Sequence, residues 1–168
     1  MKKIIYLTII MLVAFSFTLR AADKVTTEQT FDYSTELKRD FDTAYGKYAK
    51  CKVLKDKIIL LYFTASWCPP CRKFTPILVE FAKKHQDKLI VVVVSRDKTK
   101  SAAVKYMKKH NAKMFYLIKP GRYSNKLAAK FGIGGIPTVV AISKDGTLLS
   151  KNARGAITRS DKLPKTWE

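Results

Sequence analysis

The sequence predicts a layered α/β domain built on a mixed sheet. Short apolar segments rich in β-branched and aromatic residues alternate with longer amphipathic segments, which favours strands separated by helices. Near the end of the chain, Asp145-Gly146 separates two apolar runs, and this dipeptide is a strong signal for an antiparallel hairpin. Two cysteines directly follow the first predicted buried strand, at the edge where open α/β sheets hold their functional groups.

Hydrophobic periodicity predicts the individual strands and helices. Apolar residues at helical spacing predict helices at residues 31–50, 69–85, 99–110 and 125–131. Apolar runs predict strands at residues 57–64, 89–95, 114–118, 139–142 and 147–149. Pro76 falls inside the second helix, where it should remove one backbone hydrogen bond and produce a kink. The consecutive valines of the 89–95 strand predict a sheet that is covered on both faces.

Residues 1–21 have the features of a secretory signal peptide. Met1-Lys2-Lys3 provides a charged start, and Ile4 to Leu19 provides the apolar segment. We expect cleavage near Ala21 or Ala22 and export to a bacterial periplasm, with an uncleaved membrane anchor as the alternative. Residues 22–56 then form a helical extension, and residues 57–168 form the single domain of an expected monomer.

The chain is strongly basic, with 33 Lys+Arg against 13 Asp+Glu and a formal net charge of +20 at pH 7. A charge of this size attracts acidic proteins or the anionic surface of a membrane. Nucleic acid is not an expected partner, because the chain has an export signal and its lysines are spread along helices without an arginine cluster. The alternative is that the lysines only form solvated helix faces, which affects solubility and not fold.

The segment Trp67-Cys68-Pro69-Pro70-Cys71 carries the predicted chemistry, because it sets two thiols one helical turn apart between a strand and a helix. Thiol exchange needs a thiolate, whereas a free cysteine has a pKa of about 8.5. The unpaired N–H groups and the positive dipole end at a helix start favour the charged form, and Pro69 suits the first helical position. We therefore expect Cys68 to attack and Cys71 to resolve the mixed disulfide.

The sequence gives less support to other roles of the cysteines, in a metal site or a structural disulfide. A Cys-X-X-Cys can be half of a zinc site, but the chain has only three cysteines and no second Cys-X-X-Cys, and its two histidines, His85 and His110, lie at the ends of Lys-rich helical segments. We therefore expect neither a metal nor another cofactor. A structural disulfide is compatible with export, although so short a loop constrains the unfolded chain little. For Cys51 we expect a free thiol, with an intermolecular or third-cysteine redox role as the alternative.

With Pro76 and the segment Gly134-Gly135-Ile136-Pro137-Thr138 added to the cysteine pair, residues 40–155 resemble the thioredoxin superfamily. The resemblance implies a thioredoxin-like fold, a central mixed sheet flanked by helices. It also implies that Pro137 is a cis-proline facing the dithiol and that the backbone of Ile136 pairs with an extended substrate. The residues expected to shape the substrate groove are Trp67, Pro69, Pro70, Ile136 and Pro137.

Residues 62–76 are most similar to the tryparedoxin and nucleoredoxin branch, which is related to exported TlpA-like reductants. The spacing from Cys68 to Pro137 leaves room for an inserted helix and strand between the active-site helix and the cis-proline. Tyr62 stands where minimal thioredoxins have a buried aspartate, so the proton acceptor for Cys71 is unassigned. Lys119 and Arg122 stand where acidic residues are expected in this branch, which predicts different docking.

These features predict an exported thiol-disulfide oxidoreductase that reduces disulfides of protein substrates. Because a periplasm is kept oxidising, a reductant there needs a membrane electron donor. Without such a donor, the same dithiol would act as a disulfide oxidase or isomerase. As a narrower alternative, the TlpA-like similarity suggests that the protein keeps the cysteines of an apocytochrome reduced for haem attachment. The alternative from a different class is a non-catalytic thioredoxin-like binding module with a static disulfide.

Overall fold

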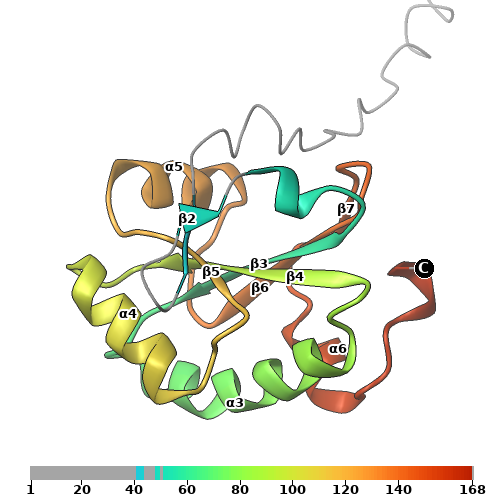
Figure 1. Cartoon of the computed structure of the whole chain (residues 1–168), viewed down its shortest axis with the longest axis horizontal. Helices are drawn as coiled ribbons and strands as arrows, with labels where there is room; N and C mark the ends of the chain where they lie inside the picture. The colour runs from blue at the N-terminus through green and yellow to red at the C-terminus, as the bar shows by residue number, and fades with distance from the viewer. Residues whose placement is uncertain (1–40, 44–47, 50, 168) are drawn as a thin grey trace, which may run out of the picture.

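A mixed β-sheet forms the centre of the domain, with helices on both of its faces (Figure 1). The computed structural model describes residues 41–43, 48–49 and 51–167. Within these residues the sheet has seven strands in the order β2-β1-β5-β4-β3-β6-β7. The strands are β1 (Phe41–Thr43), β2 (Tyr48–Ala49), β3 (Ile58–Thr64), β4 (Leu89–Ser95), β5 (Tyr116–Ile118), β6 (Thr138–Ile142) and β7 (Leu148–Ser150). The helices are η1 (Cys51–Leu54), α3 (Pro69–Lys84), α4 (Lys100–Lys109), α5 (Arg122–Lys130), α6 (Arg154–Arg159) and η2 (Lys165–Trp167), of which η1 and η2 are 3₁₀ helices.

The strand β3 lies at the centre of the sheet, and all seven of its residues are buried. It pairs in parallel with β4, from Ile58↔Leu89 to Thr64↔Ser95, and antiparallel with β6. A strand with this many apolar side chains is stable only where both faces of the sheet are covered. The carboxyl end of β3 leads into the loop that carries the cysteine pair.

Successive side chains of β3 enter two different hydrophobic cores, since side chains alternate between the faces of a strand. Leu60 and Tyr62 join a core with the helices α3, α4 and α6, whereas Leu61 and Phe63 join a core with η1 and α5. Figure 1 shows α3, α4 and α6 on one side of the sheet and α5 on the other. The dithiol loop lies where the central strand passes between these two cores.

Most predicted elements of residues 57–150 are confirmed, and local hydrogen bonds explain where the helices begin. The hydroxyl of Thr99 accepts from the backbone N–H of Ala102 at 3.2 Å, which starts α4. The predicted 125–131 helix begins earlier, at Arg122. The Ser124 hydroxyl accepts from the N–H of Gly121 at 3.1 Å and donates to its carbonyl at 2.9 Å, so the first turn forms before residue 125.

The inserted helix and strand expected before Pro137 are also present, since α4 and β5 lie between α3 and this proline. The helix α3 continues through Pro76 to Lys84. Two elements after the hairpin, α6 and η2, have too few apolar positions to be predicted from periodicity. Their residues Ile157 and Trp167 nevertheless pack into the core beneath α3.

The prediction of one helix over residues 31–50 is wrong where the structure describes this segment. Residues 41–43 and 48–49 form strands, and β1 pairs antiparallel with β5 through Asp42↔Leu117. The unpaired backbone groups of a sheet edge favour an added strand, so this long-range pairing overrides the local helical spacing. The extension predicted as helical at 22–56 therefore ends in two strands and a 3₁₀ helix.

The predicted signal peptide at residues 1–21 lies outside the described residues. In the part of the chain that the structure describes, no helix combines the length and the apolar character needed to cross a membrane.

Candidate active site

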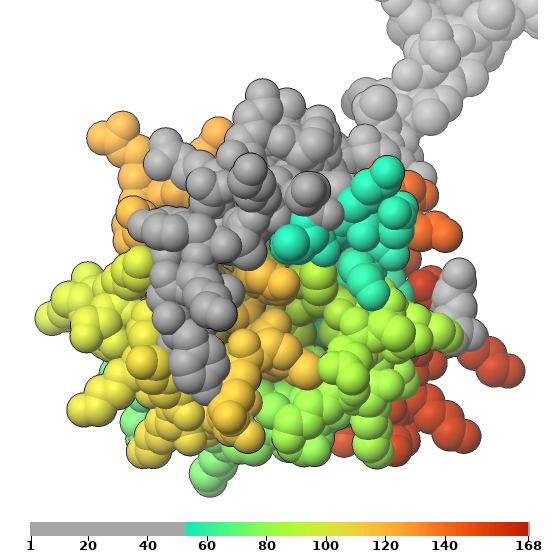
Figure 2. Space-filling model, in the orientation of Figure 1, coloured from blue at the N-terminus to red at the C-terminus, as the bar shows by residue number. Residues whose placement is uncertain are grey.

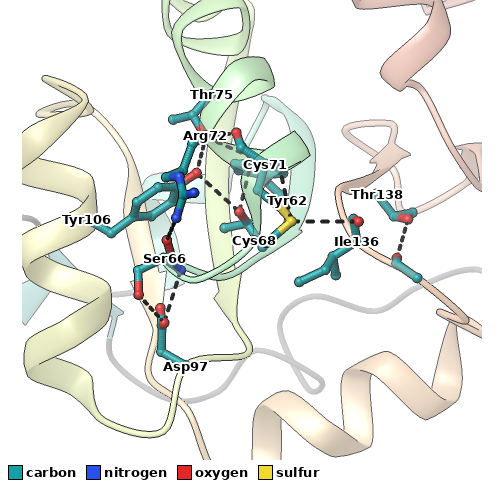
Figure 3. Close-up of a disulfide and its surroundings, with 12 residues drawn as sticks. Tyr62, Ser66, Cys68, Cys71, Arg72, Thr75, Asp97, Tyr106, Ile136 and Thr138 are labelled. Atoms are coloured by element: carbon teal, nitrogen blue, oxygen red, sulfur yellow. Dashed lines mark hydrogen bonds between the residues drawn. A yellow bond between two sulfur atoms is a disulfide. The ribbon is translucent and has the colours of Figure 1, made fainter.

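Cys68 and Cys71 form a disulfide at the amino end of α3 (Figure 3). Their Cα atoms are 5.2 Å apart. Cys68 is the N-cap residue of the helix, and its Sγ atom accepts a hydrogen bond from the backbone N–H of Cys71 at 3.2 Å. Cys68 is 3% exposed and Cys71 is 0% exposed, whereas the neighbouring Trp67 is 60% exposed. The pair therefore lies at the helix start that the sequence predicts, beside an exposed aromatic side chain.

The backbone turns from β3 into α3 within a few residues. The N–H of Cys68 donates to the Ala65 carbonyl at 3.2 Å and closes this turn, and the N–H of Arg72 donates to the Cys68 carbonyl at 3.1 Å. Pro69 and Pro70, both exposed, take the first helical positions, where an N–H would have no intrahelical acceptor. This local sequence holds the Cys68 sulfur at the positive end of the helix, which favours a thiolate once the disulfide is reduced.

A second loop approaches the dithiol from the far end of the sequence. The Ile136–Pro137 peptide bond is cis, and the Ile136 carbonyl oxygen lies 3.8 Å from the Cys68 Sγ atom. Ile136 is half-buried and packs on Cys68, Cys71 and Ala65, while Pro137 is buried. The Thr138 hydroxyl donates to the Gly135 carbonyl at 2.7 Å within this loop. Figure 3 shows Ile136 facing the sulfur atoms across the gap between the two loops.

Four buried hydroxyl groups gather below Cys71. Thr75 Oγ1 donates to the Cys71 carbonyl at 2.8 Å and is 2.8 Å from the Tyr62 hydroxyl, and it also bonds the hydroxyl of Tyr106 from α4. Thr64 Oγ1 donates to the Tyr62 hydroxyl at 3.1 Å. Burial raises the pKa of Tyr62, and the neighbouring Tyr106 raises it further, so this phenol stays neutral. Hydroxyls, and not a carboxylate, therefore hold the backbone of the deeper cysteine.

The carboxylate of Asp97 binds the loop between β3 and Cys68. Its Oδ1 atom accepts from the N–H of Ser66 at 3.0 Å and from the Ser66 hydroxyl at 2.6 Å. Its Oδ2 atom accepts from the Ser95 hydroxyl at 3.0 Å. Asp97 is 6% exposed, and a buried carboxylate is retained only with such partners. The end of β4 thus anchors the residue next to Trp67.

The reactive atoms of the site are the two cysteine sulfurs. Among the residues that the structure describes, no three His, Cys, Asp or Glu side chains come together as a metal site. His85 caps α3 and lies with its Nε2 atom 2.7 Å from the Asp161 carbonyl. His110 caps α4 and packs its ring on Tyr106 at a centroid distance of 4.8 Å.

A family model described as thioredoxin-like matches residues 56–148, which is more than half of the chain. The chain belongs to the thioredoxin-like family. The architecture above is accordingly the thioredoxin-like fold, and the protein is a thioredoxin-like oxidoreductase with a Cys-x-x-Cys pair at disulfide distance. The resemblance stated from Cys68, Cys71, Pro76 and Pro137 is confirmed.

Several relatives are similar to a large part of the chain. A tryparedoxin from Trypanosoma brucei brucei is 39% identical over 107 residues, which cover 60% of this chain and 72% of the tryparedoxin. Probable nucleoredoxin 1 from Arabidopsis thaliana is 33% identical over 139 residues, 77% of this chain and 23% of that protein. Thiol-disulfide oxidoreductase ResA from Bacillus cereus is 31% identical over 107 residues, 63% of this chain and 60% of ResA. The matches to the last two span less than two thirds of those proteins.

Solved structures show the same similarity. Native tryparedoxin I from Crithidia fasciculata superposes with a TM-score of 0.70 at 28% identity, over 79% of this chain and 94% of that chain. Tryparedoxin from Trypanosoma brucei superposes with a TM-score of 0.70 at 30% identity, over 80% and 96%. The expected similarity to the tryparedoxin and nucleoredoxin branch is therefore confirmed.

Tyr62 is recognisable from the sequence as a departure from minimal thioredoxins, whereas the contacts of Thr75, Asp97 and Tyr106 at this thioredoxin-like site were not predicted. Thr75 stands directly before Pro76, and a hydroxyl inside a buried helix face is a signal that could have found it. Asp97 lies two positions after a buried strand, at the sheet edge that carries the site, and this position was a second available signal. Tyr106 gave no such signal, because its position depends on how α4 packs against α3. Lys119 and Arg122 are exposed near the β5–α5 connection.

Proposed function

We propose that this thioredoxin-like protein is an exported thiol-disulfide oxidoreductase that reduces disulfides of protein substrates. One observation carries the proposal: the Cys68–Cys71 disulfide lies at the start of α3, 3.8 Å from the Ile136 carbonyl oxygen of a second loop. A dithiol at a helix start exchanges readily with other disulfides. The exposed Trp67 and the Ile136–Pro137 loop border the sulfur atoms and would guide an extended substrate.

The proposed exchange moves two electrons. In the reduced protein, the Cys68 thiolate attacks one sulfur of the substrate disulfide, the substrate S–S bond breaks, and a mixed disulfide forms. The first substrate sulfur leaves as a thiolate and takes up a proton. Cys71 then loses its proton and attacks the Cys68 sulfur, which releases the second substrate thiolate. The product is the Cys68–Cys71 disulfide present in the structure.

Reduction of that disulfide needs a further thiol donor, which we assign to the membrane because the proposed compartment is oxidising. Export is supported by the charged start and apolar stretch of residues 1–21. The name of the relative ResA, a thiol-disulfide oxidoreductase, supports the reaction class. The groove roles of Pro69, Pro70 and Pro137 belong to the same proposal.

The test measures the reduction potential of the Cys68–Cys71 pair and the turnover of a disulfide substrate. Equilibration of the protein with dithiothreitol buffers of graded potential gives the potential of the cysteine pair, and reduction of a peptide disulfide by dithiothreitol gives the rate. We expect turnover that Cys68→Ser abolishes, whereas the matched control Cys51→Ser retains it. A potential far below that of the compartment, combined with an absence of turnover, would instead indicate a static bridge in a binding module.

A further inference from the structure

Two exposed arginines flank the loop that carries the dithiol. Arg72, in the first turn of α3, donates from Nη1 to the Ser66 carbonyl at 3.2 Å. Arg96, directly after β4, donates its N–H to the Thr64 carbonyl at 2.8 Å and its Nη1 to Oδ1 of Asn125 at 2.8 Å. Neutral oxygen atoms bind both guanidinium groups, that of Arg72 at the dithiol loop and that of Arg96 at Asn125 of α5. These contacts orient the positive charge without cancelling it.

The acidic residue beside them does not present a carboxylate to the surface. Asp97 is buried, and the N–H of Ser66 and the hydroxyls of Ser66 and Ser95 occupy its oxygen atoms. The charge of Asp97 offsets one cation, but two more exposed cations lie close in the chain: Lys73 follows Arg72, and Lys98 is two positions after Arg96. The rim of the site therefore keeps a net positive charge.

The stretch of chain that begins at Lys98 is basic. Residues 98–144 contain eleven Lys+Arg and no Asp or Glu, and they include α4, β5, α5 and the Ile136–Pro137 loop. This segment runs from yellow-green to orange in Figure 2, and it forms much of the left half of the visible face. Burial is the main cause that lowers the pKa of His110, and the positive charges of Lys109 and Arg72 lower it further.

We infer that the site selects disulfides whose cysteines are flanked by acidic side chains, and that Arg72 and Arg96 recognise these negative charges. The inference rests on the proposed thiol-disulfide exchange and adds the class of substrate. A positive rim around the reacting sulfur raises the encounter rate of a negatively charged partner and lowers that of a positively charged one. We choose an acidic protein segment over a membrane because the charge surrounds a redox dithiol, and a lipid surface offers no disulfide to it.

Three synthetic peptide disulfides test the inference on the full-length protein. They are identical except that each cysteine is flanked by Glu, Gln or Lys, and dithiothreitol supplies the electrons. At low ionic strength we expect kcat/KM to be about tenfold higher for the Glu peptide than for the Gln peptide, and lowest for the Lys peptide. At high salt the three values should converge, because salt screens exposed charges.

Two variants that each remove one positive charge test whether the preference for the Glu peptide depends on Arg96. Arg96→Gln should reduce the Glu-to-Gln ratio about threefold, as expected for loss of one exposed cation that attracts the partner. Lys55→Gln is the control, because this exposed lysine lies before β3, at the opposite end of a strand roughly 20 Å long. The control should leave the ratio unchanged.

The possible outcomes separate the two proposals. Turnover of all three peptides with a Glu-to-Gln ratio of one or less overturns the charge selection and leaves the exchange activity intact. An equal loss of the ratio in Arg96→Gln and Lys55→Gln also overturns it, since net charge alone would then explain the preference. Binding to vesicles of anionic phospholipid that Arg96→Gln abolishes, without a preference among the peptides, would assign the arginines to a membrane. No turnover of any peptide overturns the proposed function itself.

Discussion

The Cys68 sulfur lies 3.8 Å from the carbonyl oxygen of Ile136, although 68 positions separate the two residues in the chain. The side chain of Ile136 also packs on the disulfide. The apolar side chain of Ile136 adds no charge beside the helix start, which favours the Cys68 thiolate. The contact therefore makes residue 136 a sensitive position for the reactivity of the site.

We predict that Ile136→Asp raises the thiolate pKa of reduced Cys68 by about one unit, because a carboxylate beside it disfavours a second negative charge. The pH dependence of alkylation by iodoacetamide measures this pKa. Ile136→Asn is the matched control, with similar size and no charge, and it should stay close to the wild type. Equal pKa values for the two variants would contradict the electrostatic account.

The loop before the dithiol should depend on the carboxylate of Asp97. Asp97→Ala leaves the Ser66 N–H and the Ser66 and Ser95 hydroxyls without their acceptor, and we expect the free energy of unfolding to fall by about 2–4 kcal/mol. Asp97→Asn retains one acceptor oxygen and should lose less. Urea unfolding of the oxidised proteins measures both values, and an Ala variant as stable as the Asn variant would argue against this role.

The hydroxyl cluster below Cys71 should behave as one network. Thr75→Val keeps the shape of the side chain but removes the hydroxyl that joins Tyr62, Tyr106 and the Cys71 carbonyl. We expect a loss of about 1–3 kcal/mol in unfolding free energy. The double variant with Tyr62→Phe should lose less than the sum of the two single variants. Additive losses in a double-mutant cycle would show that the hydroxyls act independently.

The stability of the protein should depend on pH through His110. Burial, followed by the charges of Lys109 and Arg72, lowers its pKa in the folded state, so the unfolded chain binds the proton more readily. The free energy of unfolding is retained above the ordinary histidine value of about 6.5 and falls as the pH drops below it. His110→Phe keeps a ring against Tyr106 and removes the titration. Denaturant unfolding at pH 7.5 and pH 5 should show a smaller acid loss for the variant, and an unchanged loss would contradict this assignment.

Local sequence signals were sufficient for the centre of the fold and for the dithiol. The β-branched runs of β3 and β4 and the placement of Pro69 after Cys68 depend on neighbouring residues alone, so the buried strands and the helix start were predictable. The spacing of Phe41 and Tyr48, in contrast, fits a helix when considered alone. The pairing of β1 with β5 is decided by an edge more than 70 positions away in the chain, and such a contact has no local signal.

The surroundings of the site were harder to predict for the same reason. Tyr62 could be singled out from its place six positions before Cys68, but its contacts with Thr75 and the neighbouring Tyr106 require α3 and α4 to pack on one face of the sheet. The bond between Asp97 and Ser66 likewise joins the ends of two parallel strands. The two reacting cysteines are therefore predictable from the sequence pattern, whereas the side chains that position them come together only through tertiary packing.

The most direct test of the account is to trap the mixed disulfide on each cysteine in turn. Reduced Cys71→Ser, incubated with a peptide disulfide, should accumulate one peptide adduct at Cys68, because the thiol that would release it is absent. Reduced Cys68→Ser should form little adduct at Cys71, which is fully buried. Mass spectrometry of the intact proteins and of their proteolytic fragments measures both. Equal adduct formation at the two positions, or none at Cys68, would contradict the assignment of Cys68 as the attacking thiol.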